Sequence, residues 1–310
     1  RGSYLPGRYT HFTLYERKPR RISAAPFADR VVHHALTQII EPIWESRFIH
    51  DSYACRRGKG THAALDRVTH FACRYPYVLQ CDVRQFFPSI DHAILAQLLA
   101  RRIVDAPTLA LCQTIINSGR GIHREAYQMQ WFPGDDLFAL ARPRGLPIGN
   151  QTSQFWANVY LHELDQFVKQ ELRCPAYIRY VDDLLLFAPD KPTLHQWRAA
   201  ISRFLQMLRL VIHPHKSRVY PVTIGIPFLG FVVYPDHRRL RRSAGIHFAR
   251  RFRRKVRAYT AGELPLDNLR GSVHGWLGHA RHGDTYGLRR AILSGTLITP
   301  PRPGGAGGRP

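Results

Sequence analysis

The segment AYIRYVDDLLLFAP, residues 176–189, says most about how this chain folds. Two adjacent aspartates, Asp182 and Asp183, stand here between apolar segments that have the character of β-strands. Because side chains alternate between the two faces of a strand, one of the two acids should point toward an apolar layer, where an unpaired carboxylate is costly. The apolar residues LLLF continue the strand after the acids. The pair therefore indicates a functional site, and turn chemistry at a hairpin tip is the structural alternative.

A third aspartate has similar surroundings. Asp82 ends the apolar segment YVLQCD, residues 77–82, so it could meet the later pair only through tertiary structure. Three carboxylates brought together repel one another and hold a proton at neutral pH. Divalent metal relieves this repulsion, and oxygen ligands of this kind suit Mg²⁺. Two such ions activate an attacking oxygen and stabilise a leaving oxygen in a displacement at phosphorus.

The charge of the chain indicates its partner. The 310 residues include 45 Lys and Arg against 22 Asp and Glu, which gives a net charge of +23. Such an excess requires a polyanion, usually nucleic acid, with an anionic membrane surface as the rival. No apolar run is long enough to span a membrane and no signal-peptide pattern is present, so we expect no membrane partner. The five scattered cysteines fit neither a zinc site nor a disulfide framework, which favours reduced thiols in a cytoplasmic protein.

The remaining patterns predict helices mixed with short strands, in two or three subdomains. A basic hairpin is expected over residues 11–26, with ERKPRR as its turn. A helix beginning at residue 28 is expected to end at Pro42, and Asp91 is expected to cap the helix that follows it. Further helices are predicted over residues 59–73, 91–103, 150–172, 193–210 and parts of 244–295, with strands at 77–82 and 227–235.

Seven segments resemble, in order, the sequence blocks of reverse transcriptases. They are RKPRRISAAPFADRVVHHAL, SYACRRGKGTHAAL, CDVRQFFPSIDH, RGLPIGNQTSQFWANVYL, YVDD, HPHKSRVYP and IPFLGF. The resemblance implies an α+β fold of the right-hand polymerase type. We expect fingers at 1–76, a palm at 77–235 with fingers insertions and an antiparallel sheet backed by helices, and a basic α-helical thumb at 236–296. The composition of residues 297–310 is typical of a disordered tail.

The resemblance also implies roles for single residues at the reaction centre. Asp82, Asp182 and Asp183 would be the catalytic metal ligands, joined by the backbone carbonyl of Val83, for two Mg²⁺ ions that Mn²⁺ could replace. Lys216 matches the lysine thought to protonate the leaving pyrophosphate, which is general acid work; a surface lysine is the alternative. Five residues in two segments are expected to bind the nucleotide. The cations Lys18 and Arg21 would hold the triphosphate, and Ile148, Gly149 and Gln154 would support the incoming base.

Other positions are expected to contact the sugar and the nucleic acid backbone. Phe87 lies five residues after Asp82, as the family's sugar gate does, and its ring would exclude a 2′-hydroxyl; a core aromatic is the alternative, and Phe86 is the expected core ring. Arg56 is expected on the template backbone. The basic thumb helix should follow the duplex backbone through Arg250, Arg251, Arg253, Arg254 and Lys255.

One departure from the common pattern narrows the resemblance. Most reverse transcriptases carry Gln-Gly and then Ser-Pro in the template-support block, whereas this chain has Ile148 in place of the Gln and Gln154 in place of the Pro. The form IGNQTSQ resembles the reverse transcriptases of diversity-generating retroelements, which copy a template-repeat RNA into mutagenised cDNA. An aliphatic side chain offers only shape, and the loss of a polar discriminator lowers selectivity; simple packing of Ile148 is the alternative.

This resemblance implies a set of partners, and it leaves other functions as alternatives. The partners would be template RNA, nascent cDNA, deoxynucleotides and a small helical-bundle accessory variability determinant, in a bacterial or phage-encoded system. A retron, antiphage-defence or group II intron-type reverse transcriptase keeps the chemistry but changes the biology. A non-catalytic RNA-binding scaffold is disfavoured by the three intact aspartates, and an RNA-templated RNA polymerase by Phe87.

Overall fold

A computed structural model describes residues 4–15 and 19–299 of the chain. Lys18 and most of the expected tail lie outside the described residues. The chain divides into two compact units, one formed by Arg1–Ala64 with Tyr77–Tyr220 and the other by Leu65–Pro76 with Pro221–Pro310. The boundaries of these units differ from those expected for fingers, palm and thumb, so that division stays a prediction. Each unit is described by itself.

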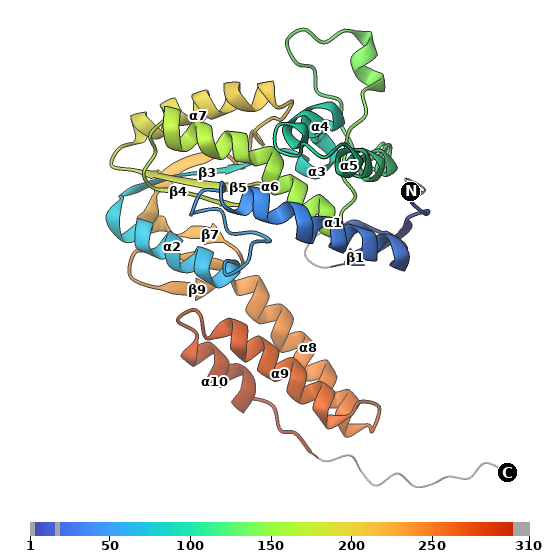
Figure 1. The fold of residues 1–310 in the computed structure, drawn as a ribbon. Helices are drawn as coiled ribbons and strands as arrows, with labels where there is room; N and C mark the ends of the chain where they lie inside the picture. The colour runs from blue at the N-terminus through green and yellow to red at the C-terminus, as the bar shows by residue number, and fades with distance from the viewer. Residues whose placement is uncertain (1–3, 16–18, 300–310) are drawn as a thin grey trace, which may run out of the picture. The chain divides into compact units, whose positions relative to one another are not determined.

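The first unit is built on a four-stranded sheet with the order β4-β5-β3-β6. Its strands are β3 (Tyr77–Asp82), β4 (Tyr177–Tyr180), β5 (Asp183–Ala188) and β6 (Arg218–Pro221). β5 runs antiparallel to both β3 and β4. Helices α6 (Gln151–Gln166) and α7 (Lys191–Met207) run across one side of this sheet (Figure 1). An antiparallel sheet backed by helices, as predicted for a palm, is thereby confirmed.

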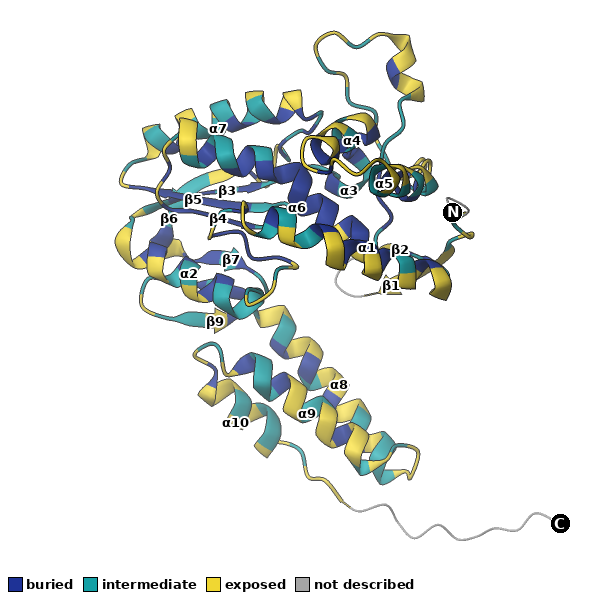
Figure 2. Ribbon diagram, in the orientation of Figure 1, coloured by how far each residue is buried: buried dark blue, intermediate teal, exposed yellow. Residues whose placement is uncertain are grey.

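Further helices complete the first unit. α6 continues as a π-helical turn, η2 (Phe167–Glu171). Asp91 caps α4 (His92–Ala100), because its carboxylate accepts the N–H groups of Ala93 and Ile94, as predicted. The other helices are α1 (Phe27–Glu45), α3 (Phe86–Ser89), α4 (His92–Ala100), α5 (Ala106–Ser118) and the short η1 (Leu137–Ala141). Buried residues of α1, α4, α5, α6, α7 and the sheet form one continuous core. The ribbon is dark blue at buried residues in Figure 2.

The prediction that Pro42 ends the first helix is wrong. α1 continues through Pro42 to Glu45. Proline removes one backbone donor, so the carbonyl four residues earlier, at Gln38, loses its helical partner. Gln38 is exposed, and water can replace that partner, while Ile40 and Trp44 bury the same helix against the core.

A basic hairpin precedes α1, as predicted. β1 (Thr10–Tyr15) and β2 (Pro19–Ala24) pair antiparallel, with Thr10 opposite Ala24. The backbone N–H of Ser23 donates to the carbonyl of Ile148 at 2.8 Å, which fastens β2 to the loop before α6. Gly149 makes this approach possible, because it has a φ of +125° and an added Cβ would lie 3.0 Å from Ile22 Cγ2.

The second unit combines a small sheet with three helices from the C-terminal part of the chain, the first of which is strongly basic. The sheet contains β7 (Ile226–Phe228), β8 (Phe231–Val233) and β9 (Arg238–Leu240), all antiparallel. The helices are α8 (Arg242–Thr260), α9 (Leu266–Ala280) and α10 (Tyr286–Ser294), and most of α2 (Thr61–Arg74) also belongs to this unit. Phe248 of α8 stacks on Trp276 of α9, with ring centroids 4.0 Å apart. Within the described ranges, no helix is both long and apolar enough to cross a membrane.

Candidate active site

The structure brings the three predicted aspartates together at one end of the central sheet. Asp82 is the last residue of β3 and lies directly opposite Asp183, the first residue of β5. Asp182 occupies the two-residue turn between β4 and β5, next to Val181, whose φ is +54°. The N–H of Val83 donates to the carbonyl of Asp182 at 3.4 Å. Residues far apart in the sequence are thus held together by strand pairing.

Burial and neighbouring charges disfavour the ionised form of Asp182. Its burial, together with the charges of Asp183 and Asp82, raises the pKa of this carboxyl from its ordinary value of 3.8 to about 7. The nearby charge of Lys216 offsets this shift only in part, so a cation bound here would be stabilised by the acids.

Lys216 is in direct contact with one of the acids. Its Nζ lies 2.6 Å from Oδ2 of Asp82, in an ion pair whose side chains are 45% and 18% exposed. The backbone also joins the two segments, since the N–H of His213 donates to the carbonyl of Asp82 at 2.7 Å. In this conformation Lys216 neutralises Asp82, so the predicted general acid role requires the lysine to leave this partner.

The donor set suits a hard divalent cation. Three carboxylates and the backbone oxygens of the adjoining strand ends are oxygen ligands, which Mg²⁺ prefers to the nitrogen and sulfur that zinc takes. However, within residues 4–15 and 19–299 the structure has no group of three or more His, Cys, Asp or Glu side chains that could hold a metal ion as they stand. The residue types fit the ion, and binding would require Asp82 to exchange Lys216 for it.

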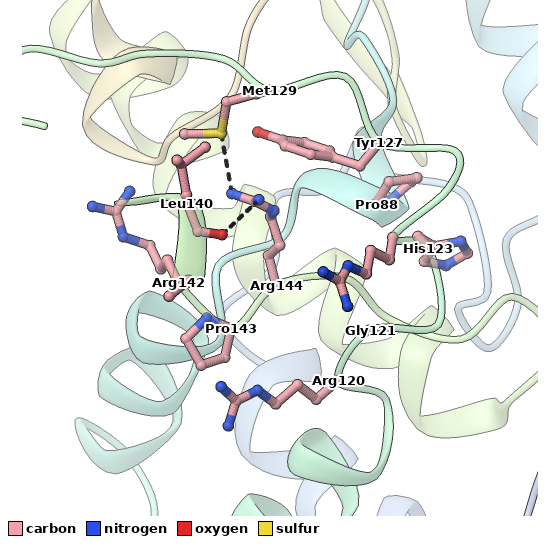
Figure 3. A pocket seen from close by; sticks show the side chains of 12 residues that line it. Pro88, Arg120, Gly121, His123, Tyr127, Met129, Leu140, Arg142, Pro143 and Arg144 are labelled. Carbon is pink, nitrogen blue, oxygen red and sulfur yellow. Dashed lines mark hydrogen bonds between the residues drawn. The ribbon is translucent and has the colours of Figure 1, made fainter. Parts of the chain in front are cut away.

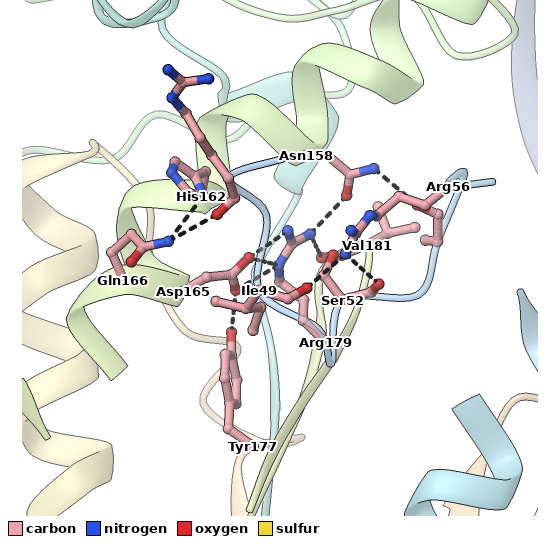
Figure 4. A network of polar contacts seen from close by, with 12 residues as sticks. Ile49, Ser52, Arg56, Asn158, His162, Asp165, Gln166, Tyr177, Arg179 and Val181 are labelled. Atoms are coloured by element: carbon pink, nitrogen blue, oxygen red, sulfur yellow. Dashed lines mark hydrogen bonds and ion pairs between the residues drawn. The ribbon is translucent and has the colours of Figure 1, made fainter. Parts of the chain in front are cut away.

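A buried arginine shapes the turn that carries Asp182. Arg179 in β4 is fully buried, and its guanidinium forms bonds of 2.7–3.0 Å with the carboxylate of Asp165 in α6 (Figure 4). The same guanidinium donates to Asn158 Oδ1 at 2.9 Å and to the carbonyl of Val181 at 3.2 Å. Tyr177 adds a hydrogen bond of 2.8 Å to Asp165. The turn is therefore fastened to α6 through Arg179.

We did not predict this network from the sequence. The available signal was a charged residue inside the apolar strand segment AYIRY, because a buried charge needs a partner. The sequence shows no such signal for the partner, since Asp165 lies in a helix with other polar residues.

The structure contradicts the expected role of Arg56. Its side chain is only 5% exposed and pairs with Glu45 at 2.7 Å. It also donates to the carbonyls of Ile49 and Ser52 at 2.6 and 2.9 Å (Figure 4). Its guanidinium also lies 5.2 Å from the ring centroid of Phe48. A guanidinium enclosed in this way cannot reach a template phosphate, so Arg56 holds the fold instead.

The residues predicted to meet the nucleotide lie in neighbouring segments of the first unit. Arg21 in β2 is half exposed and pairs with Glu125 at 3.3 Å. Phe87 is partly buried with its ring edge-on to Phe86, at 5.5 Å between centroids, and Phe86 is a core residue as expected. The carbonyl of Phe87 accepts the N–H of Leu146 at 3.0 Å, which brings the turn after Asp82 beside the loop of Ile148.

The template-support positions differ in exposure. Ile148 is partly buried, whereas Gly149 and Gln154 are exposed. Gln154 accepts a hydrogen bond from the thiol of Cys55 at 3.4 Å. Their predicted contacts with a base remain predictions.

The residues predicted to contact the nucleic acid backbone lie on α8 of the second unit. Phe248, Phe252 and Val256 form the buried stripe of this helix. Lys255 is half-buried and donates to the carbonyl of Asn268 at 3.4 Å. The other positions are exposed and are named here the α8 arginines: Arg250, Arg251, Arg253 and Arg254.

The sequence profile of the family "Reverse transcriptase (RNA-dependent DNA polymerase)" matches residues 14–233. This match covers most of the chain, which therefore belongs to the reverse transcriptase family.

The chain is also similar in sequence to curated proteins. Protein YkfC of Escherichia coli K12 is 25% identical over 267 residues, covering 73% of this chain and 66% of the relative. The group II intron-encoded protein LtrA of Lactococcus lactis is 28% identical over 172 residues, covering 54% of this chain and 26% of the relative. The chain therefore spans just under two thirds of the first relative and about a quarter of the second.

Solved structures share the fold at low identity. An apo telomerase from Candida tropicalis, truncated from its C-terminal domain, matches with a TM-score of 0.53 and 13% identity over 74% of this chain and 53% of that one. A telomerase of the same organism, in complex with a fragment of telomeric RNA, gives a TM-score of 0.54 and 10% identity over 93% and 55%. The likeness confirms the predicted right-hand polymerase fold.

Proposed function

We propose that this protein is an RNA-directed DNA polymerase that works with two divalent metal ions, Mg²⁺ by preference. The observation that carries the proposal is the meeting of Asp82, Asp182 and Asp183 at one end of the sheet, in a chain of the reverse transcriptase family. The net charge of +23 supports a nucleic acid substrate. Template RNA, growing cDNA and deoxynucleotides would be the ligands.

The residues of the site would divide the work of nucleotidyl transfer. Asp82, Asp182, Asp183 and the carbonyl of Val83 would hold the ions, which supply activation of the attacking oxygen and stabilisation of the leaving one. Arg179 keeps the turn of Asp182 in place through the Val181 carbonyl. Lys216, once free of Asp82, can give a proton to the leaving pyrophosphate, because its Nζ already lies at the acids.

The neighbouring segments would select and hold the substrates. The ring of Phe87 would lie against the 2′ position of the sugar and exclude a hydroxyl there. Arg21 and Lys18 would bind the triphosphate, where guanidinium offers two parallel bonds and ammonium a point charge. The α8 arginines would follow the duplex backbone and make binding dependent on salt.

The narrower proposal is mutagenic copying of a template-repeat RNA in a diversity-generating retroelement. It is supported by the form IGNQTSQ, in which Ile148 offers shape without a hydrogen bond. A small helical-bundle accessory protein would be the partner. A group II intron-type role is the second candidate, because LtrA is an intron-encoded protein and a nuclear intron maturase of Arabidopsis thaliana is 31% identical over 100 residues, 31% of this chain and 14% of the relative.

Sequencing of cDNA separates the two candidates. One defined RNA is copied by the parent, by Ile148→Gln and by the control Ile148→Val, which keeps an aliphatic side chain. Mutagenic copying predicts errors concentrated opposite template adenine in the parent and in Ile148→Val, and fewer in Ile148→Gln. Uniformly low errors opposite all four bases in the parent would refute the retroelement role and leave an ordinary reverse transcriptase.

A further inference from the structure

An arginine-rich cavity lies in the segment between α5 and α6. Its volume is about 380 Å³, within the range of about 300–1,000 Å³ typical of pockets for small organic ligands. Apolar residues and Tyr127 form part of the wall, and Figure 3 shows Arg120 and Arg144 reaching it from different turns of the chain. Four guanidinium groups belong to the lining, those of Arg120, Arg124, Arg142 and Arg144.

One of these charges is already neutralised. Arg142 pairs with Asp135 at 2.8 Å and with Asp91 at 3.6 Å, and Arg209 pairs with the same two acids. The arginines hold the pKa of Asp135 well below its usual range. These two acids are therefore committed to Arg142 and Arg209 and leave no charge for the other cations.

A second arginine is held in a fixed orientation. The guanidinium of Arg144 lies 4.1 Å from the ring centroid of Tyr127, donates to the carbonyl of Leu140 at 3.3 Å and contacts the sulfur of Met129 at 3.5 Å (Figure 3). None of these partners is an acid, so the positive charge is uncompensated. An arginine fixed before binding loses little freedom when it meets an anion.

The remaining two arginines have no acidic partner. Arg120 and Arg124 are exposed, and no ion pair joins either one to a carboxylate in the part of the chain that the structure describes. No carboxylate is among the described residues that line the cavity. Three uncompensated guanidinium groups around one cavity repel one another until an anion enters.

We propose that this cavity binds one nucleoside phosphate of an unpaired RNA strand, with the phosphate on Arg120, Arg124 and Arg144. The cavity is large enough for a nucleoside as well as a phosphate, and its wall of Tyr127 and apolar side chains suits a base. A single strand fits the proposed function, because a polymerase must hold template that is not yet paired. The inference rests on that proposed function only for the source of the nucleoside phosphate.

The test measures binding without synthesis. A short fluorescein-labelled single-stranded RNA is titrated with the full chain in EDTA, at several salt concentrations, and fluorescence anisotropy is read. Arg120→Gln with Arg124→Gln should weaken binding about three- to tenfold at low salt. It should also reduce the slope of log K against log salt by about 1.4, since each phosphate contact on a single strand contributes about 0.7.

A matched double variant controls for charge alone. Arg102→Gln with Arg203→Gln removes the same charge from exposed positions of the first unit that do not line the cavity. This control variant should bind the RNA with an affinity within about twofold of the parent and should keep the parental slope of log K against log salt. Equal losses in both double variants, or no loss in the cavity variant, would overturn the proposal. Excess dATP should not displace the RNA; displacement that the cavity variant abolishes would assign the cavity to a free nucleotide and overturn the strand assignment.

Primer extension by the parent in Mg²⁺ is run beside the titration. A parent that fails to extend a primer would refute the polymerase, whereas a selective loss of RNA affinity in the cavity variant would still support the cavity. The two proposals therefore fail separately.

Discussion

Replacing Asp182 by asparagine should stabilise the metal-free protein and abolish catalysis. The pKa of this carboxyl is raised to about 7 by burial and by the charges of Asp183 and Asp82. Below about pH 4 the folded and unfolded states are both protonated, so the group has no effect on stability. Between pH 4 and 7 the unfolded chain releases the proton while the folded chain keeps it, so stability falls as pH rises, and above pH 7 the full penalty is present.

The size of this penalty follows from the shift. Each pKa unit corresponds to about 1.4 kcal/mol. Since Asp182 is only partly buried and its repulsion is screened by solvent, we expect roughly 1–3 kcal/mol from a shift of this size. For a chain of this length that corresponds to a rise in Tm of about 2–5 °C for Asp182→Asn in EDTA at pH 8. Mg²⁺ should raise the Tm of the parent more than that of the variant.

Thermal unfolding across pH 5–8, with and without Mg²⁺, measures both effects. Glu171→Gln is the matched control, because it removes one exposed carboxylate from the same unit and should leave Tm unchanged within about 1 °C. If Asp182→Asn is no more stable than the parent at pH 8, or if the difference does not grow with pH, the three acids do not repel one another in the folded protein.

Three further predictions concern the surroundings of the site. Asp165→Asn should lower the free energy of unfolding by about 3–5 kcal/mol in urea titrations, because it leaves a buried arginine without its carboxylate. The control Glu163→Gln, in an exposed ion pair, should lower it by at most about 1 kcal/mol. An equally small loss for Asp165→Asn would show that the buried network does not hold the turn. Phe87→Ala should increase the ratio of ribonucleotide to deoxynucleotide incorporation, and an unchanged ratio in a folded variant would make Phe87 a core residue only. Changing the α8 arginines to alanine should flatten the dependence of duplex binding on salt, by about 0.9 for each phosphate that is no longer neutralised; an unchanged slope would place the duplex elsewhere.

Local patterns were sufficient to predict much of the scaffold. The capping role of Asp91, the hairpin before α1 and the burial of Phe86 follow from neighbours in the sequence, and the structure confirms them. The meeting of Asp82 with the later acids was inferred from two apolar strands that each end in a carboxylate, and the strand register places Asp82 opposite Asp183.

Tertiary partners account for what the sequence could not show. Arg56 has the same sequence context as a solvent-exposed arginine, and only the fold brings Glu45 and Phe48 around it. Pro42 lies in a helix whose buried face outweighs the loss of one hydrogen bond. The cavity lined by Arg120 and Arg144 forms from separate turns of an irregular segment, which has no periodic pattern that would bring them together.

Primer extension on an RNA template is the decisive test of the catalytic assignment. The assay supplies deoxynucleotides and Mg²⁺ and compares three proteins: the parent, Asp82→Asn and the control Lys191→Gln. Lys191 lies in α7, at a position that we place outside the reaction site. The binding of each protein to the same RNA is measured in parallel. We predict that the parent and Lys191→Gln extend the primer, while Asp82→Asn binds RNA with parental affinity and makes no product. Extension by Asp82→Asn at the parental rate would contradict the assignment of the three aspartates as the catalytic centre.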